Sequence, residues 1–318
     1  MSQQNLSQTR VVDPILSEHA RGYRRAGNVG HLLFPIAPVN SYGGKVIEFG
    51  KEAFRLYNAR RAPGARFKRL EFGYEGKPYA IVPGGLEAVV PKERMKEAEQ
   101  VPSLNLATRS VNLVLAAMQL EHEYDCAQLA RNAANYDNDH KVTLLPANSW
   151  GSDDSDPNRD VNTGMEAIGD TIGVEGNTVL LSRHAFNKLK FNPKIIERIK
   201  YTGRDAVTTD LLKALWNVDN VVVGGAKVAT GQTDTLGDVW GNDVVVAYVA
   251  QGAGDGMGNQ EEPSFGYTYA IDGMPSVEEP YFEKATNSFI YQVINDATPV
   301  LAGMTGGYLI QGAGADPA

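Results

Sequence analysis

The chain has 318 residues, of which 42% are hydrophobic and 21% charged, and its formal net charge is −8. This balance is typical of folded proteins rather than disordered ones, and the negative charge argues against bulk binding to DNA. A single cysteine, Cys126, excludes an internal disulfide and fits a reducing compartment. The first residues lack an apolar core of signal-peptide length, and the longest apolar run, VNLVLAAMQL, is too short to span a bilayer. We therefore expect a soluble protein of the cytoplasmic type.

The first part of the chain is predicted to form a polar arm and then an extended hairpin. Residues 1–38 have little to bury by themselves, so the arm is expected to order against something else. Residues 39–92 contain short strand-like pieces separated by turn pairs such as Pro63–Gly64. The stretch from Ala53 to Leu70 carries no acid and these cations: Arg55, Arg60, Arg61, Arg66, Lys68 and Arg69.

Three interpretations of this basic stretch remain open at this point. Its cations alternate with aromatic residues, a pattern compatible with nucleic-acid contact, although no known binding motif surrounds them. A protruding basic hairpin could equally meet an acidic surface on another copy of the chain, where complementary charge would fix the orientation. The third interpretation is a solvated charged loop.

The strongest helix signal covers Ser103 to about Asn135, with Ser103 as the expected N-cap. At 1.5 Å per residue this helix would be roughly 45–50 Å long, which suggests an element that crosses the whole molecule. Residues at steps of three and four are predicted to share one face: Val111, Leu115, Met118, His122, Cys126 and Leu129.

The rest of the chain mixes helices and strands. A polar loop precedes a helix expected near Val161–Gly173, and NTVLLS is predicted to be a buried strand followed by the short helix RHAFNKL. Pro193 stands at a helix-start position, and TTDLLKALW predicts a capped helix before the valine-rich strand NVVVGG. DVWGNDVVVAYVA and the C-terminal segments are strand-like. The fold class is therefore α+β.

Nucleotide and metal sites fail on spacing. None of the three Gly-Lys pairs is followed by Ser or Thr, and the glycine-rich GAGDGMG at 252–258 is followed by a segment that cannot open a helix. Asp154, Asp156, Asn158 and Asp160 alternate as in a calcium loop, but Arg159 and Met165 occupy the positions that need glycine and an acid. The five histidines show no ligand spacing.

Candidate nucleophiles are also weak. His122 and Cys126 stand four residues apart on the apolar face of the long helix, where a packed cysteine beside a satisfied histidine is the expected arrangement. Ser182 and His184 lie at a strand end without a nucleophile-elbow context. We expect no catalytic residue, no cofactor and no metal site.

The order of elements resembles the tailed-phage major capsid proteins with the Hong Kong 97 fold. The resemblance is carried mainly by Val161–Val228, where the helix VNTGMEAIGDTIG leads to NTVLLSRHAFNKLK and then to LLKALWNVDNVVVGGAKV. DVWGNDVVVAYV fits the strand that follows in the family, and FIYQVINDATPVLAGM resembles its closing strand with a short acidic turn. The likeness is one of layout, and it covers nearly the whole chain.

The resemblance implies a fold with an N-terminal arm, an extended β-hairpin loop, a long spine helix in a peripheral domain, and an axial α/β domain. The implied division is an arm (1–38), the extended loop (39–92), a peripheral domain with the spine helix (93–148), an axial domain (149–263), further peripheral strands (264–302), and a C-terminal strand and tail (303–318). The extended loop would lie over a neighbouring subunit. Arg55, Arg60, Arg61, Arg66, Lys68 and Arg69 would then contact carboxylates of that neighbour.

The implied function is a structural protein of the virion that self-assembles into pentamers and hexamers of an icosahedral shell in the host bacterial cytoplasm. The shell would enclose double-stranded DNA without sequence preference. Because the arm begins almost at Met1, a separate scaffolding protein is expected, together with a portal protein and a decoration protein. The alternatives are an encapsulin-like cellular compartment, an α/β enzyme using Ser182 or His184, and a nucleic-acid-binding protein acting through the hairpin.

Overall fold

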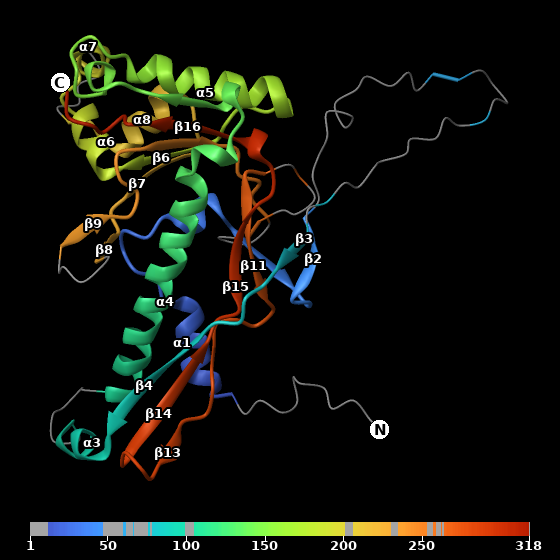
Figure 1. The fold of residues 1–318 in the computed structure, drawn as a ribbon, viewed down its shortest axis with the longest axis vertical. Coiled ribbons are helices and arrows are strands. Elements are labelled where there is room, and N and C mark those ends of the chain that lie inside the picture. Colours follow the sequence, from blue (N-terminus) through green and yellow to red (C-terminus); the bar gives the residue numbers. More distant parts are fainter. Residues whose placement is uncertain are drawn as a thin grey trace.

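The computed structural model describes residues 12–46, 60–61, 66, 76, 78–98, 105–200, 206–229, 235–252, 257–258, 262 and 264–317. The long helix α4 (Leu106–Arg131) runs from a body built on a five-stranded sheet to a second body built around strand β14 (Ser288–Ile294) (Figure 1). A three-stranded sheet lies beside α4 between the two bodies.

The five-stranded sheet has the order β5-β16-β10-β6-β7. Its strands are β5 (Lys141–Thr143), β6 (Thr178–Ser182), β7 (Asn220–Gly224), β10 (Val244–Ala247) and β16 (Gly307–Gln311). The end pairs β5–β16 and β6–β7 are parallel, whereas β10 is antiparallel to both of its neighbours. Strand β16, from the end of the chain, thus lies inside this sheet.

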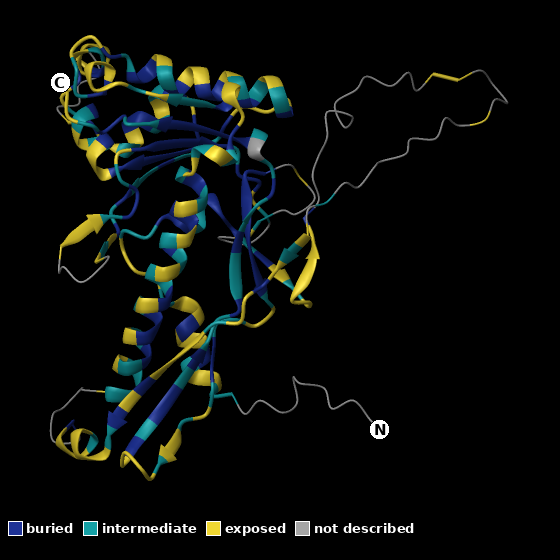
Figure 2. Ribbon diagram, in the orientation of Figure 1, coloured by how far each residue is buried: buried dark blue, intermediate teal, exposed yellow. Residues whose placement is uncertain are grey.

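Both faces of this sheet are covered, which explains why its inner strands are apolar throughout. On β6, Val179 and Leu181 pack into the core beneath α5 (Pro157–Ile172), whereas Leu180 faces the core shared with α4. The same alternation holds for β10, because successive side chains of a strand point to opposite faces. Figure 2 shows the central strands buried between the helical layers.

Capping residues and a proline define where the helices around this sheet begin. Ser182 caps α6 (Arg183–Leu189), Pro193 opens α7 (Pro193–Ile199), and Thr208 caps α8 (Thr209–Trp216). These predicted elements are confirmed. Helix α5 begins four residues earlier than predicted, because Asp156 accepts a hydrogen bond from the Arg159 backbone N–H and Pro157 fits the first turn.

Helix α4 is shorter than predicted. It has 26 residues, which at 1.5 Å each is about 39 Å, and its N-cap is Asn105, whose side chain accepts from the Thr108 N–H at 3.2 Å. Ser103, the predicted cap, lies outside the described residues. The predicted apolar face is confirmed at Val111 and Cys126, which are fully buried.

The second body is a small antiparallel sheet covered by α4 and α1 (Pro14–Gly22). Strand β14 pairs on one side with β4 (Gly85–Pro91) and on the other with β12 (Ser276–Val277) and β13 (Tyr281–Glu283). Helix α3 (Lys92–Ala98) follows β4 directly.

The three-stranded sheet has the order β1-β11-β15, and Ala37, Tyr267 and Tyr269 form its core with Val46 and Ile81. Its strands are β1 (Ile36–Val39), β11 (Gly266–Ile271) and β15 (Ala297–Leu301). Helix α4 lies against β15, and the short helix α2 (Gly30–Leu33) lies against β11. Two hairpins complete the fold: β2 (Gly43–Lys45) with β3 (Pro78–Ala80), and β8 (Lys227–Ala229) with β9 (Leu236–Asp238). The six-part division of the chain stays a prediction.

Candidate assembly interface

The predicted contact residues fall partly within the described structure. Arg60, Arg61 and Arg66 are described and are exposed. Arg55, Lys68 and Arg69 lie outside the described residues. The base of the predicted hairpin lies within the described residues. It consists of β2 and β3, which pair in antiparallel register with Gly44 opposite Tyr79.

The base of the predicted hairpin contacts the three-stranded sheet through a ring stack and the hydrogen bonds of a buried carboxylate. The ring of Tyr79 stacks on that of Tyr269 in β11, with centroids 4.1 Å apart and planes within 6°. Asp296, which is buried, accepts a hydrogen bond from the Tyr42 hydroxyl at 2.8 Å and another from the Gly84 N–H at 3.1 Å. Ile81 is also buried at this base. These contacts fix the positions of β2 and β3 against the three-stranded sheet.

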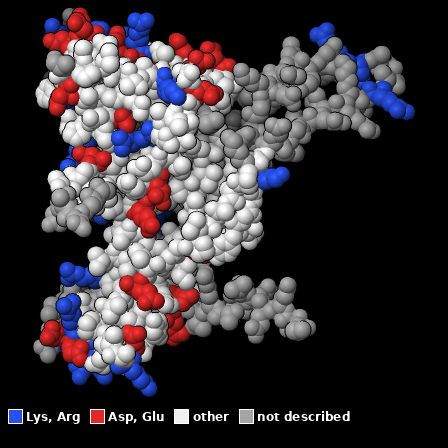
Figure 3. Space-filling model, viewed as in Figure 1, with Lys and Arg blue, Asp and Glu red and all other residues white. Residues whose placement is uncertain are grey.

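An acidic surface lies on α4, away from its apolar face. Glu121 and Asp125 are exposed and stand one helical turn apart, so they repel each other. Partial burial raises the pKa of Asp125, and the charge of Glu121 raises it further. Figure 3 shows acidic side chains gathered over the middle of α4. A cation from a neighbouring molecule would relieve this repulsion.

A buried carboxylate joins the N-terminal segment to the spine helix. Glu123 is 1% exposed, and its oxygens accept from the backbone N–H groups of Val29 at 3.0 Å and Gly30 at 2.7 Å. The indole N–H of Trp240 donates to the same carboxylate at 2.6 Å. Burial raises the pKa of Glu123, and the three donors oppose that rise.

The sequence analysis did not single out Glu123. The available signal was its position four residues before Ala127 and seven before Ala130, both of which are buried on the same side of α4. Gly30 is required next to it, because a Cβ there would stand 2.8 Å from a Glu123 oxygen and 2.9 Å from the Cys126 Cβ.

The pair His122 and Cys126 is packed as predicted. The thiol of Cys126 lies 3.7 Å from Nδ1 of His122, whose Nε2 lies 3.0 Å from the Thr268 hydroxyl. Burial raises the pKa of the Cys126 thiol well above its usual value, so the reactive thiolate is disfavoured. Burial lowers the pKa of His122 to about 4, and the charge of His31 contributes to this shift.

Ser182 and His184 also have structural roles. The Ser182 hydroxyl is fully buried and accepts from the Ala185 N–H at 3.2 Å as the cap of α6. His184 contacts the Asp238 carboxylate at 2.9 Å and links α6 to β9. A buried cap is poorly placed to act as a nucleophile.

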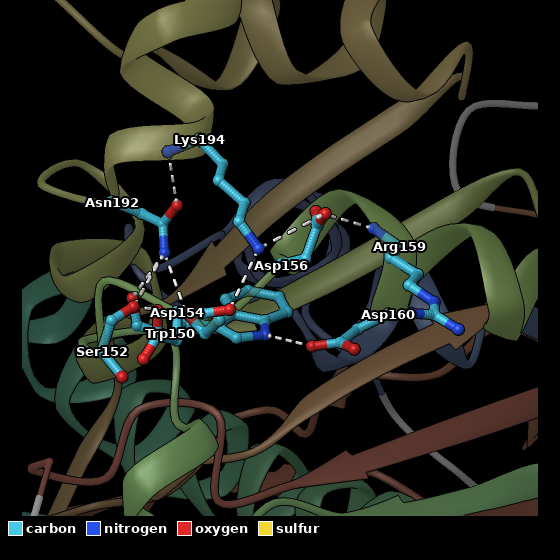
Figure 4. A network of polar contacts seen from close by, with 9 residues as sticks. Trp150, Ser152, Asp154, Asp156, Arg159, Asp160, Asn192 and Lys194 are labelled. Atoms are coloured by element: carbon cyan, nitrogen blue, oxygen red, sulfur yellow. Dashed lines mark hydrogen bonds and ion pairs between the residues drawn. The ribbon is translucent and has the colours of Figure 1, made fainter.

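The acidic loop that resembles a calcium site does not converge on a cation. Asp156 caps α5, Asn158 accepts from the Trp216 indole at 3.0 Å, and Asp160 accepts from the Trp150 indole at 2.9 Å. Figure 4 shows Lys194 reaching into the loop, where its Nζ donates to the Asp154 carbonyl at 3.0 Å. Across the described ranges, no group of three or more His, Cys, Asp or Glu side chains could hold a metal ion. No helix in those ranges is both long and apolar enough to cross a bilayer.

Comparisons with known proteins agree on one class of protein. No protein-family model matches the chain. The chain is 34% identical to the protein named major capsid protein of Burkholderia phage BcepMu, over 96% of this chain and 98% of that protein. It is 56% identical to a phage-related protein from Bordetella bronchiseptica RB50, whose crystal structure matches with a TM-score of 0.84 over 97% of this chain and 99% of that one.

A more distant solved structure shares the fold alone. The capsid of cyanophage P-SCSP1u matches with a TM-score of 0.50 at 12% identity, covering 91% of this chain and 89% of that one. The predicted mixed helix-and-sheet capsid fold is confirmed by these similarities.

Proposed function

The chain belongs to the family of tailed-phage major capsid proteins, and we propose that its copies meet through the basic hairpin when they form the head shell. The shell-forming function rests on 34% identity to a phage major capsid protein over nearly the whole chain. The chain is a structural protein of the virion rather than an enzyme. The cellular-compartment alternative is disfavoured, because the relative with this identity is a phage protein.

The cations of the hairpin are the contact residues in this proposal. Arg60, Arg61 and Arg66 are exposed on an excursion whose base is fixed by Asp296 and by the stacked Tyr79 and Tyr269. Arg55, Lys68 and Arg69 belong to the same run in the sequence. A fixed base reduces the entropy lost when the excursion docks on a neighbour, which favours binding.

The receiving carboxylates are Glu121 and Asp125 on α4 of the adjacent copy. This pair supports the proposal because its two like charges stand one turn apart and the pKa of Asp125 is already raised. An arginine placed between them would favour both ionised forms and would lower that pKa. Opposite charges on two different surfaces of one chain give a head-to-tail contact, which closes into rings when the rotation fits.

The complete head shell would be built from such rings together with other phage proteins. The rings would be pentamers and hexamers, built in the host bacterial cytoplasm on a separate scaffolding protein and joined by a portal protein and a decoration protein. A net charge of −8 suits a container for double-stranded DNA, because phosphate binding grows with each cation engaged. The nucleic-acid-binding alternative is less favoured, because the chain outside the basic run is strongly acidic.

Charge reversal tests the proposed contact. We expect Arg60→Glu combined with Arg61→Glu to abolish shells while the subunit keeps its circular dichroism spectrum and melting temperature. The matched control is Arg198→Glu combined with Lys200→Glu, another pair of exposed cations, which should still assemble. Electron microscopy and light scattering of the purified particles give the readout. Normal shells from the hairpin variant would refute the contact.

A charge swap tests the receiving carboxylates. Adding Glu121→Arg and Asp125→Arg to the hairpin variant should restore assembly, because every copy then carries both reversed surfaces. If shells stay absent while the carboxylate variant alone assembles normally, another acidic surface receives the hairpin.

A further inference from the structure

The sheet around β14 has an open edge on strand β4. The Lys92 N–H donates to the Asn287 carbonyl at 3.1 Å, and the Asn295 N–H donates to the Gly84 carbonyl at 2.9 Å. In an antiparallel pair these bonds recur at every second residue, so the even-numbered residues of β4 face β14. The backbone groups of Glu87 and Val89 therefore point outward, and no other described strand pairs with them.

A groove of about 470 Å³ runs along this edge, between β4 and the side of α4. It is lined by Tyr23, Val89, Val90, Pro91, Arg94, Leu106, Arg109, Ser110, Asn112, Leu113 and Ala116. Val89 is 55% exposed and Leu113 is 73% exposed. An open strand edge has unpaired backbone N–H and C=O groups that can bind a further strand, and the exposed apolar side chains beside it favour such binding. Soluble proteins usually cover an edge of this kind or protect it with charged residues.

The positive charge of the groove lining favours an acidic partner. Its lining includes Arg94 and Arg109 but no acid. The carboxylates of Glu93 and Glu87 lie outside this lining, where Glu93 accepts from the Asn287 amide at 2.6 Å and Glu87 accepts from the Gln292 amide. An acidic extended segment therefore fits this groove, whereas the basic hairpin of a neighbour would be repelled.

The opposite edge of the same sheet, on β13, is also open and carries aromatic and acidic side chains. Because Phe289 pairs toward β4, Phe282 of β13 stands in a non-hydrogen-bonded pair, and its backbone N–H and C=O point outward. Tyr281 is 44% exposed and Phe282 is 40% exposed. The segment from 276 to 283 contains three glutamates and no cation.

We propose that the β4 edge of one copy takes the β13 edge of a second copy, so that the two sheets continue into each other across the subunit boundary. This inference rests on the shell-forming function. The carboxylates of Glu279 and Glu283 meet Arg94 and Arg109, and the rings of Tyr281 and Phe282 cover Val89 and Leu113. The two edges differ, so the contact is head-to-tail and adds copies in one rotational sense.

A cysteine pair tests the contact directly. Val89 and Tyr281 both pair with Ile290 from opposite sides of β14, so they share one face of the sheet and are about 9–10 Å apart within one copy, too far for an internal disulfide. Shells purified from cells expressing Val89→Cys with Tyr281→Cys should give a ladder of covalent multimers after mild oxidation. The matched control, Val89→Cys with Leu145→Cys, should stay monomeric. Shells that form but give no ladder would overturn the inference, whereas failure of the unaltered chain to form any shell would count against the proposed function.

Charge reversal gives a second test. Arg94→Glu with Arg109→Glu should reduce the yield of shells at least tenfold, and adding Glu279→Arg with Glu283→Arg should restore it. Normal yield from the arginine variant would refute the inference and leave the shell function intact. Lost assembly that the glutamate swap does not restore would also refute β13 as the occupant and would point to another acidic partner.

Discussion

Replacing Glu123 with alanine should detach the segment around Val29 and Gly30 from α4. The substitution leaves three buried donors without their acceptor: the N–H groups of Val29 and Gly30, and the indole N–H of Trp240. Losing one partner of a buried charged network typically costs about 3–5 kcal/mol, because the remaining polar groups stay desolvated. We therefore expect the free energy of unfolding of the subunit to fall by about that amount.

Urea unfolding of the unassembled subunit measures this loss, and tryptophan fluorescence is a suitable probe because Trp240 lies in the site. Glu121→Ala is the matched control, since Glu121 is exposed on the same helix and its loss should change stability by less than about 0.5 kcal/mol. Limited proteolysis should cut the segment before α2 earlier in the Glu123 variant. A destabilisation below about 1 kcal/mol would refute the view that this carboxylate anchors the N-terminal segment.

Two further predictions concern the same region. Gly30→Ala should destabilise the subunit by about 1–3 kcal/mol in thermal melts, because its Cβ would meet Glu123 and Cys126, whereas Gly22→Ala, where nothing lies within 4 Å, should be neutral or stabilising by up to about 1 kcal/mol. His122 has a folded pKa of about 4 against about 6.5 unfolded, so the unfolded chain binds more protons between these values and stability falls as the pH falls. At about 1.4 kcal/mol per pH unit the loss approaches about 3 kcal/mol near pH 4, and a His122→Gln variant that kept the full pH dependence would contradict this origin.

The acidic loop shows how spacing alone can mislead. Asp154, Asp156, Asn158 and Asp160 alternate as calcium ligands do, and the residues at two further positions, with Pro157 and the serines, argued against the site. In the folded protein Asp156 caps α5, and Asn158 and Asp160 in the first turn of that helix accept hydrogen bonds from two indoles. Those donors, Trp150 and Trp216, could not be assigned to the loop from the sequence.

Several short elements were determined by the sequence itself. The caps at Ser182 and Thr208 and the proline at Pro193 act within one helical turn, so their signals can be read without the rest of the fold. The buried strand β6 was predictable because a strand covered on both faces has to be apolar at successive positions. The order of these elements was also enough to identify the family.

Only the tertiary structure decided which distant segments meet. Strand β16 enters the five-stranded sheet between β5 and β10, and β1 pairs with β11 more than two hundred residues later. The donors to Glu123 come from about ninety residues before it and more than a hundred after it. The two open edges around β14 arise in the same way, because an edge is defined by the partners that a strand lacks. A local pattern fixes how a segment folds, but its hydrogen-bonding partners are fixed by the packing of the whole chain.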